Sequence, residues 1–427
     1  MKMNQMKLIS ITIINNEVRI IVRKMIEFEN SLFGDETNVN VYDIIDVEFW
    51  VNRIVLLPSI RPFSLERTVR MCEEYVKNDE FKRLFIKKAA NSCYVLLYRL
   101  FQSGIISFSE IHQYLESDTS LVLCYYFRKE IKDFQNQICH KWSTEDFDES
   151  FFQNDEDIDK MINFGFLPSS IEYCLKYDDL DGFREIISYS SNSINWSPFE
   201  WSKKPPKNDI LSFSGFFGSI HCFKHLLING YSISNDIFNS IVCGGNTDLF
   251  HLFNFSSIDY SACIYYSIVF CRISMLIFAI ENGAKNTIAY SYSNDSPLHI
   301  ASKYGHLCII DYLIRNSYDI NGKNDNESTP LHIASQNGFR WVIESLVNNG
   351  AELNTVDEYQ LTPLYYAAEY GNISCFECLK NNGADFSGHI NGETYLHWAA
   401  AKGHLKTIMS LFPKWPDINE KNSNYLT

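Results

Sequence analysis

The sequence predicts a mostly all-α protein in which a helical N-terminal region precedes an α-solenoid of short helix pairs with β-turn tips. Three observations support this prediction. A motif recurs about every 33 residues near the C-terminus, and apolar residues recur at helical spacing upstream of it. In addition, 46% of the 427 residues are hydrophobic, with only 19 Gly and 11 Pro, so the chain can bury a core.

The charge of the chain argues against nucleic acid as a partner. The formal net charge is −15 at pH 7, with 52 acidic residues against 37 Lys and Arg. A protein that binds nucleic acid needs a concentrated basic surface to meet the phosphates. We therefore expect no nucleic-acid partner.

The N-terminus and the cysteines predict a cytoplasmic or nuclear location. The apolar run at 8–14 is interrupted by Ser10 and Thr12, and no small-residue cleavage site follows it. Twelve cysteines in a chain without a secretory signal are expected to be reduced and used as small buried apolar residues.

Residues 1–144 are expected to form a helical N-terminal region. Apolar spacing predicts a helix over 17–33, although 7–23 also fits a β-hairpin that turns at Asn15-Asn16. The acidic run that follows predicts a linker over 145–165. The further helices expected in this region span 41–56, 65–77, 80–103, 109–116 and 119–140.

Residues 166–294 are expected to hold degenerate helical repeats with an insertion at 196–207. Chain reversals are predicted at positions 178, 218, 245, 271 and 305. The apolar stretch 263–280 must also be considered as a membrane span, which needs about 20 apolar residues. Arg272 lies in its middle, so two short buried helices are favoured and no membrane span is expected.

Four copies of one motif define the region 295–427. Their leucines, at 298, 331, 364 and 396, are spaced 33, 33 and 32 residues apart, and a glycine follows each seven residues later. Pro suits the first helical position, and Gly suits the reversal between two helices. The motif residues with expected structural roles are Pro297, His299, Gly305, Pro330, His332, Gly338, Pro363, Gly371, His397 and Gly403.

The segments Ser-Pro-Leu-His-Ile-Ala at 296–301 and Thr-Pro-Leu-His-Ile-Ala at 329–334 resemble the ankyrin repeat. The resemblance implies helix pairs joined by β-turn or hairpin tips, with histidines that link neighbouring turns through hydrogen bonds. The order of helical, degenerate and regular regions is similar to that of expanded ankyrin families of protists, which carry an N-terminal domain of unknown function.

The last copy departs from the pattern. Tyr395 replaces the proline, and Trp415-Pro416 replaces the Gly-Ala pair that closes earlier copies. The chain ends at Thr427, in phase with Thr362, so a fifth copy is expected to be cut off there.

Sequence motifs for metal binding, phosphate binding or catalysis are weak throughout the chain. The pair Cys375 and Cys378 has no second pair for zinc, and His221 and His225 lack the Glu of a metalloprotease motif. The acids from Asp155 onward lack the glycine and the final glutamate of a calcium loop. No phosphate-binding loop or nucleophile elbow occurs. We expect no metal, no cofactor and no enzymatic activity.

The surface of the regular repeats is the expected functional site, because solenoid tips and first helices form an extended concave face. The insertion, with Trp196, Phe199 and Trp201, is a second candidate. The residues expected to bind a partner are Lys303, Tyr304, Asp325, Asn326, Glu327, Gln336, Asp357, Glu358, Tyr359, Glu369, Tyr370 and Lys402.

Three functions follow as hypotheses. The resemblance implies a non-enzymatic scaffold that binds a partner protein. The alternative is an adaptor, for example a ubiquitin-ligase substrate receptor, whose N-terminal helices recruit machinery. The third is an enzyme with an unrecognised site in the N-terminal half.

Overall fold

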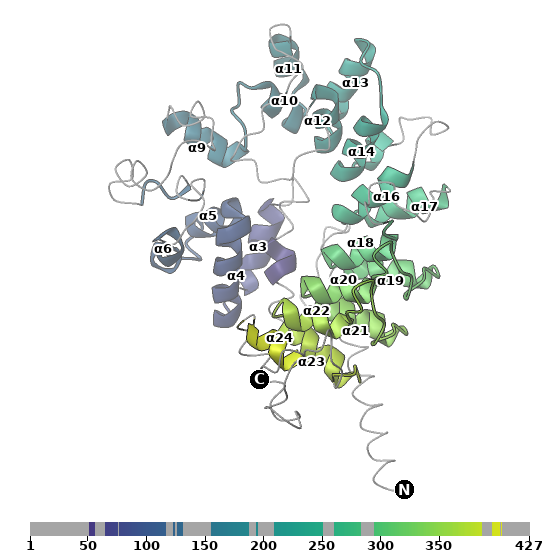
Figure 1. The fold of residues 1–427 in the computed structure, drawn as a ribbon. Coiled ribbons are helices and arrows are strands. Elements are labelled where there is room, and N and C mark those ends of the chain that lie inside the picture. Colours follow the sequence, from purple (N-terminus) through teal and green to yellow (C-terminus); the bar gives the residue numbers. More distant parts are fainter. Residues whose placement is uncertain are drawn as a thin grey trace, which may run out of the picture. The chain divides into compact units, whose positions relative to one another are not determined.

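The computed structural model confirms the all-α prediction, with twenty helices and no β-strand among the residues it describes (Figure 1). Contacts divide the chain into two units, which contain the described residues up to 250 and from 260 onward. The described residues are 51–55, 65–75, 77–116, 123, 126–130, 155–187, 194, 209–250, 260–282, 294–386, 395–401 and 403.

The first unit begins with a small helical cluster. Its helices are α3 (Leu65–Tyr75), α4 (Asp79–Ser92), α5 (Tyr94–Gln102) and α6 (Phe108–Glu116). The single helix expected over 80–103 is wrong, because the backbone at Cys93 leaves the helical region with φ −145° and ψ 73°. The break allows α5 to pack against α3 and α4 and to bury Val95, Leu96, Leu97 and Leu100.

The expected linker 145–165 is also partly wrong, because α9 (Asp155–Phe164) lies within it. Ile158, Met161 and Ile162 have helical spacing and are at most 2% exposed, so the acidic run contains an amphipathic helix. Asp159 accepts hydrogen bonds from Arg128 and Lys129. Burial alone would raise the pKa of Asp159, but these two cations lower it. Residues 145–154 lie outside the described part of the chain.

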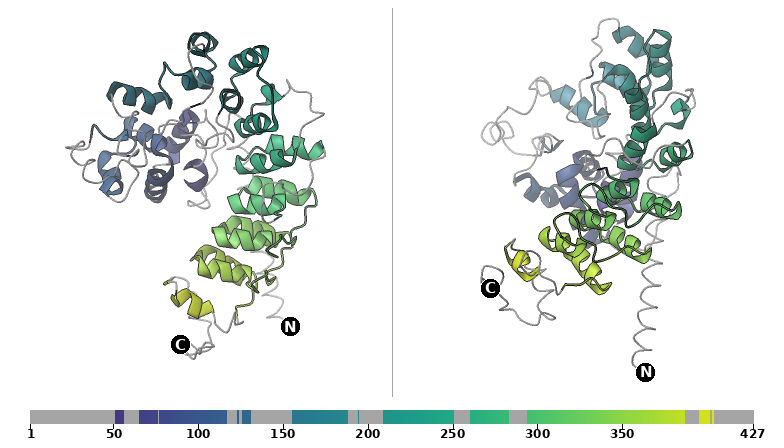
Figure 2. Two further views of the ribbon diagram at one scale, coloured as in Figure 1. Left: turned by 45° about the horizontal axis from the view of Figure 1, so that its top comes forward. Right: turned by 45° about the vertical axis from the view of Figure 1, so that its right-hand side comes forward.

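Helix pairs continue through both units. The first unit contains α10 (Ile171–Tyr177), α11 (Leu180–Ile187), α12 (Ile210–Phe217), α13 (Ile220–Ile228), α14 (Asn235–Gly244) and α15 (Thr247–Phe250). The second contains α16 (Tyr260–Val269), α17 (Ile273–Glu281), α18 (Pro297–Tyr304), α19 (Leu307–Arg315), α20 (Pro330–Asn337), α21 (Arg340–Asn348), α22 (Pro363–Glu369), α23 (Ile373–Asn381) and α24 (Tyr395–Ala401). Figure 2 shows the pairs of the second unit, in green to yellow, stacked on one another in chain order.

The five predicted chain reversals are confirmed. Each position separates the two helices of a pair and has a positive φ. This left-handed conformation ends a helix and turns the chain back, and glycine adopts it most easily. The φ angles are 56° at Asp178, 73° at Gly218, 74° at Gly245, 52° at Cys271 and 72° at Gly305.

The apolar stretch 263–280 is divided between α16 and α17, as predicted. Cys271 turns the chain and Arg272 is 2% exposed. Among the described helices, none has both the length and the apolar character needed to cross a membrane. The cysteines of the described residues are all buried.

Asn372 stabilises the end of α20 from the following repeat. Its side-chain amide donates to the carbonyl oxygens of Ser335 and Gln336, each at 2.9 Å. We expect Asn372→Ala to lower the free energy of unfolding by about 1–2 kcal/mol, because two part-buried carbonyls lose their donor. Urea unfolding of the full chain measures this loss. Asn316→Ala is the matched control, since Asn316 donates to a carbonyl of its own helix at an exposed site. Equal midpoints for the two variants would contradict the prediction.

Candidate functional site

The candidate site lies on the first helices and tips of the regular repeats. Each first helix, α18, α20 and α22, begins with a proline at its first position, at Pro297, Pro330 and Pro363. Proline has no backbone N–H to leave unpaired there. The preceding Ser or Thr adopts an extended conformation and marks the helix start.

The starts of α18 and α20 are each fastened to the next repeat by one histidine. The Nδ1 of His299 accepts from the backbone N–H of Ser296, and its Nε2 donates 2.8 Å to the carbonyl oxygen of Ser328. His332 makes the same bonds, from the Thr329 N–H and to the Leu361 carbonyl oxygen. These are the links between turns that the resemblance implied.

Both histidines are neutral under ordinary conditions. Burial lowers the pKa of His299, which is 2% exposed. Burial also lowers the pKa of His332 to about 4. A neutral ring is required for these contacts, because Nδ1 must accept a hydrogen bond while Nε2 donates one.

The third and fourth copies depart from the motif at different positions. Tyr365 stands at the histidine position of the third copy and is 3% exposed. Tyr395 stands at the proline position of the fourth copy, and its hydroxyl lies 2.9 Å from the Oγ1 of Thr362. His397 lies half-buried in α24. The repeat glycines all have positive φ, with 72° at Gly305, 79° at Gly338, 69° at Gly371 and 72° at Gly403.

The tips are turns held by one polar side chain each. Asn324 accepts through Oδ1 from the backbone N–H groups of Asn326 and Ser328, at 3.1 and 2.9 Å. One repeat later, Asp357 accepts from the N–H groups of Tyr359 and Leu361, both at 2.9 Å. The side chain therefore acts as an Asx turn that sets the shape of each tip.

This arrangement corrects the role expected for Asp357. It was predicted to bind a partner, but it is 1% exposed, and its second oxygen accepts from the hydroxyl of Tyr366 at 2.6 Å. An acid in a short polar turn bonds to its own backbone when the turn folds, so its carboxylate does not reach the surface.

The other predicted tip residues lie at the surface. Asp325, Asn326, Glu327, Glu358 and Tyr359 are exposed, with Tyr359 at 64%. The backbone N–H of Glu358 donates 3.1 Å to the carbonyl oxygen of Asn326, which joins two successive tips. The two tips therefore form one edge, on which Asp325 and Glu358 are exposed and Glu327 pairs with Lys323 at 3.1 Å.

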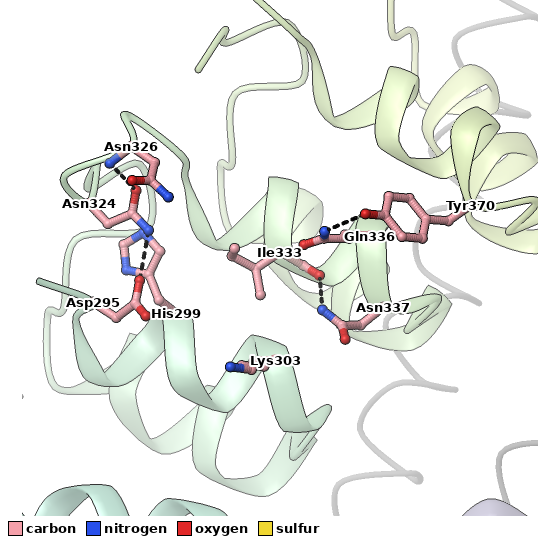
Figure 3. Close-up of a pocket in the computed structure, with 9 residues that line it drawn as sticks. All are labelled: Asp295, His299, Lys303, Asn324, Asn326, Ile333, Gln336, Asn337 and Tyr370. Atoms are coloured by element: carbon pink, nitrogen blue, oxygen red, sulfur yellow. Dashed lines mark hydrogen bonds between the residues drawn. The ribbon is translucent and has the colours of Figure 1, made fainter. Parts of the chain in front are cut away.

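Beside this edge lies a groove of about 600 Å³ (Figure 3). It brings together four of the predicted partner-binding residues, which are Lys303, Asn326, Gln336 and Tyr370. Gln336 donates 2.9 Å from Nε2 to the hydroxyl of Tyr370, which joins α20 to the end of α22. Tyr304 and Glu369 are not among its lining residues. Lys402 lies outside the described part of the chain.

More than half of the groove's lining residues were not predicted to bind a partner. The remaining lining residues are Asp295, His299, Asn324, Ile333 and Asn337. Ile333, Gln336 and Asn337 are spaced i, i+3 and i+4 on α20, so extending the face of Gln336 along the helix would have found them.

The remaining motifs do not assemble a reactive site in the described residues. The carboxylate of Asp178 accepts from the N–H groups of His221 and Cys222, each at 3.0 Å, and lies 2.6 Å from the Nδ1 of His221. It therefore joins the start of α13 to the previous helix pair. Cys375 and Cys378 are both buried on α23. No group of three His, Cys, Asp or Glu side chains suited to a metal ion occurs among the described residues. The insertion 196–207 lies outside them.

Comparison with known proteins identifies the repeats. Residues 211–357 and 344–422 match a family model described as ankyrin repeats (3 copies). No curated protein matches the chain. The matched description specifies no narrower group, so the expected protist families and N-terminal domain remain predictions.

Proposed function

Because residues 211–422 are ankyrin repeats, we propose that this protein is a non-enzymatic scaffold that binds a partner protein through the tips and groove of 294–386. Ankyrin repeats generally mediate protein–protein interactions. The observation that carries the proposal is the convergence of Lys303, Asn326, Gln336 and Tyr370 on one groove beside the exposed tips.

Rigidity supports this function. The groove is built on helices whose starts are fastened by buried histidines and whose tips are closed by Asn324 and Asp357. A surface that is ordered before binding loses little conformational freedom when a partner binds. Tyr370, which is 51% exposed, offers a large amphipathic ring of the kind enriched at interfaces.

The charge of the tips favours a partner with a basic surface. Asp325, Glu327 and Glu358 are exposed on successive turns, and Lys323 pairs with Glu327 at 3.1 Å, so the three acids outnumber the one lysine. Complementary charges of this kind raise association rates and select between partners. We therefore expect recognition to depend on the signs of these three side chains.

The test compares three full-length proteins in capture from a source-cell lysate. The tip variant carries Asp325→Lys, Glu327→Lys and Glu358→Lys, and it keeps Asp357 because that residue shapes the turn. The control carries Glu281→Lys, Glu352→Lys and Glu377→Lys, which are exposed acids outside the tips and make the same change in net charge.

We expect the wild type and the control to capture the same protein, and the tip variant to lose it. Equal capture by all three proteins would contradict a role for the tips. The control separates a specific tip effect from a general effect of charge, because both variants change the total charge equally.

A further inference from the structure

Lys303 is the only lysine or arginine among the groove's described lining residues. It lies on the last turn of α18 and is exposed. Among the described residues, no carboxylate lies within 4.0 Å of its ammonium group. Its three N–H donors are therefore available to a ligand.

The acid that lines the same groove is already engaged. The Oδ1 of Asp295 accepts from the Nδ2 of Asn324 at 2.7 Å. Figure 3 shows Asp295 and Asn324 together at one end, Tyr370 and Gln336 at the other, and Lys303 between them. The cation is thus the groove's strongest unused polar group, and the carboxylate is held by the tip.

Neutral groups around Lys303 suit a peptide. Gln336 and Asn337 use their side-chain amide N–H groups within the repeats, toward the Tyr370 hydroxyl and the Ile333 carbonyl oxygen. Their side-chain carbonyl oxygens remain available to accept from the backbone N–H groups of a ligand. The half-buried Ile333 adds an apolar contact for the aliphatic part of a side chain.

We propose that the groove binds an extended peptide segment of a partner protein by pairing one Asp or Glu side chain with Lys303. This inference rests on the proposed function and specifies the chemistry of the ligand. A carboxylate supplies the acceptor oxygens that an ammonium group requires, and a charge-assisted hydrogen bond is about twice as strong as a neutral one. The volume of about 600 Å³ falls within the usual range for ligand pockets.

The overall charge of −15 does not oppose this contact. At physiological ionic strength the Debye length is about 8 Å, so exposed charges farther away are largely screened. The acidic tips nearby favour basic residues elsewhere in the same segment. The tips favour basic residues and Lys303 favours an acidic residue. A segment that carries both charges can therefore bind in only one register.

The test selects binders from a display library of random peptides, using the full-length protein. We expect the wild type to enrich peptides that carry Asp or Glu at one aligned position. Lys303→Glu should replace that preference with Lys or Arg and should weaken binding of the wild-type peptides about tenfold or more. A switch of preference cannot arise from loss of folding, because an unfolded groove selects no motif.

The matched control is Lys224→Glu, which makes the same charge change at an exposed lysine on α13. It should leave the selected motif unchanged. Selected peptides without acidic enrichment would overturn the inference, as would equal affinity for the wild type and Lys303→Glu, or a failure to select any peptide.

The failure of this inference is distinguishable from that of the proposed function. If the tip variant loses its captured protein while Lys303→Glu keeps the wild-type motif, the tips bind a partner and the acidic segment is wrong. If the tip variant captures the same protein and Lys303→Glu selects the same peptides as the wild type, both proposals are wrong.

Discussion

Gly244→Ala is expected to destabilise the protein strongly, although alanine is the better helix former. A Cβ atom at Gly244 on α14 would lie 2.1 Å from the backbone carbonyl oxygen of Phe216 on α12. Backbone atoms cannot rotate away, so the two helices must separate. Overpacking of this kind costs about 1–3 kcal/mol or more, while alanine gains at most about 1 kcal/mol in helix propensity. Urea unfolding of the full chain should show a lower midpoint.

Gly182→Ala is the control for that prediction. Gly182 lies within α11 of the same unit, and an added Cβ would meet the side chains of Asp179 and Cys174. Side chains can shift, so this variant should lose much less stability than Gly244→Ala. An unchanged or raised midpoint for Gly244→Ala would contradict the close approach of α12 and α14.

Acid is expected to weaken the repeats before most carboxylates titrate. The pKa of His332 is about 4 in the folded protein, against 6.5 for an ordinary histidine. The unfolded chain therefore binds more protons between these values. The contribution of His332 to the free energy of unfolding is complete above pH 6.5 and decreases as the pH drops toward 4. The loss from pH 7 to 4.5 is about 2 kcal/mol for this group. Burial also lowers the pKa of His299, so this residue adds to the loss of stability in acid.

Urea midpoints measured from pH 7.5 to 4.5 test this dependence. His332→Gln should be less stable at pH 7 but should show a shallower decline with falling pH, because the titrating group is gone. His112→Gln is the control, since His112 is exposed on α6, and it should keep the wild-type slope. The same slope in wild type and His332→Gln would contradict the role assigned to His332.

The reversals and repeat starts were predictable because a few residue types determine them. Gly218, Gly245 and Gly305 adopt positive φ at the predicted positions. The prediction also held at Asp178 and Cys271, which are not glycines. Around Asp178, the residues Lys176-Tyr177 and Leu180 match Lys303-Tyr304 and Leu307 around Gly305, and Gly283-Ala284 matches the pair that closes later repeats.

Two errors have a common physical origin, because charge was taken as a sign of solvent exposure. The acids of α9 lie on the outer side of a helix whose apolar residues, such as Met161, are buried. Asp357 is charged but turns its carboxylate onto backbone N–H groups. Local hydrogen bonds and amphipathic spacing decided both cases, and composition did not reveal either.

The groove was predictable only in part. Lys303, Gln336 and Tyr370 follow from their phase on first helices, and Asn326 from its place on a tip. The way in which Asp295 and Asn324 close one end depends on a contact between two loops. Such a contact arises from tertiary packing and leaves no local pattern in the sequence.

A partner protein is expected to contact the tips and the groove of 294–386. Hydrogen exchange of the full-length protein, with and without the captured partner, tests it most directly. We expect slower exchange on binding at 324–327, at 357–360 and along α18 and α20. Slower exchange confined to α19, α21 and α23, or to the helices of the first unit, would contradict this expectation.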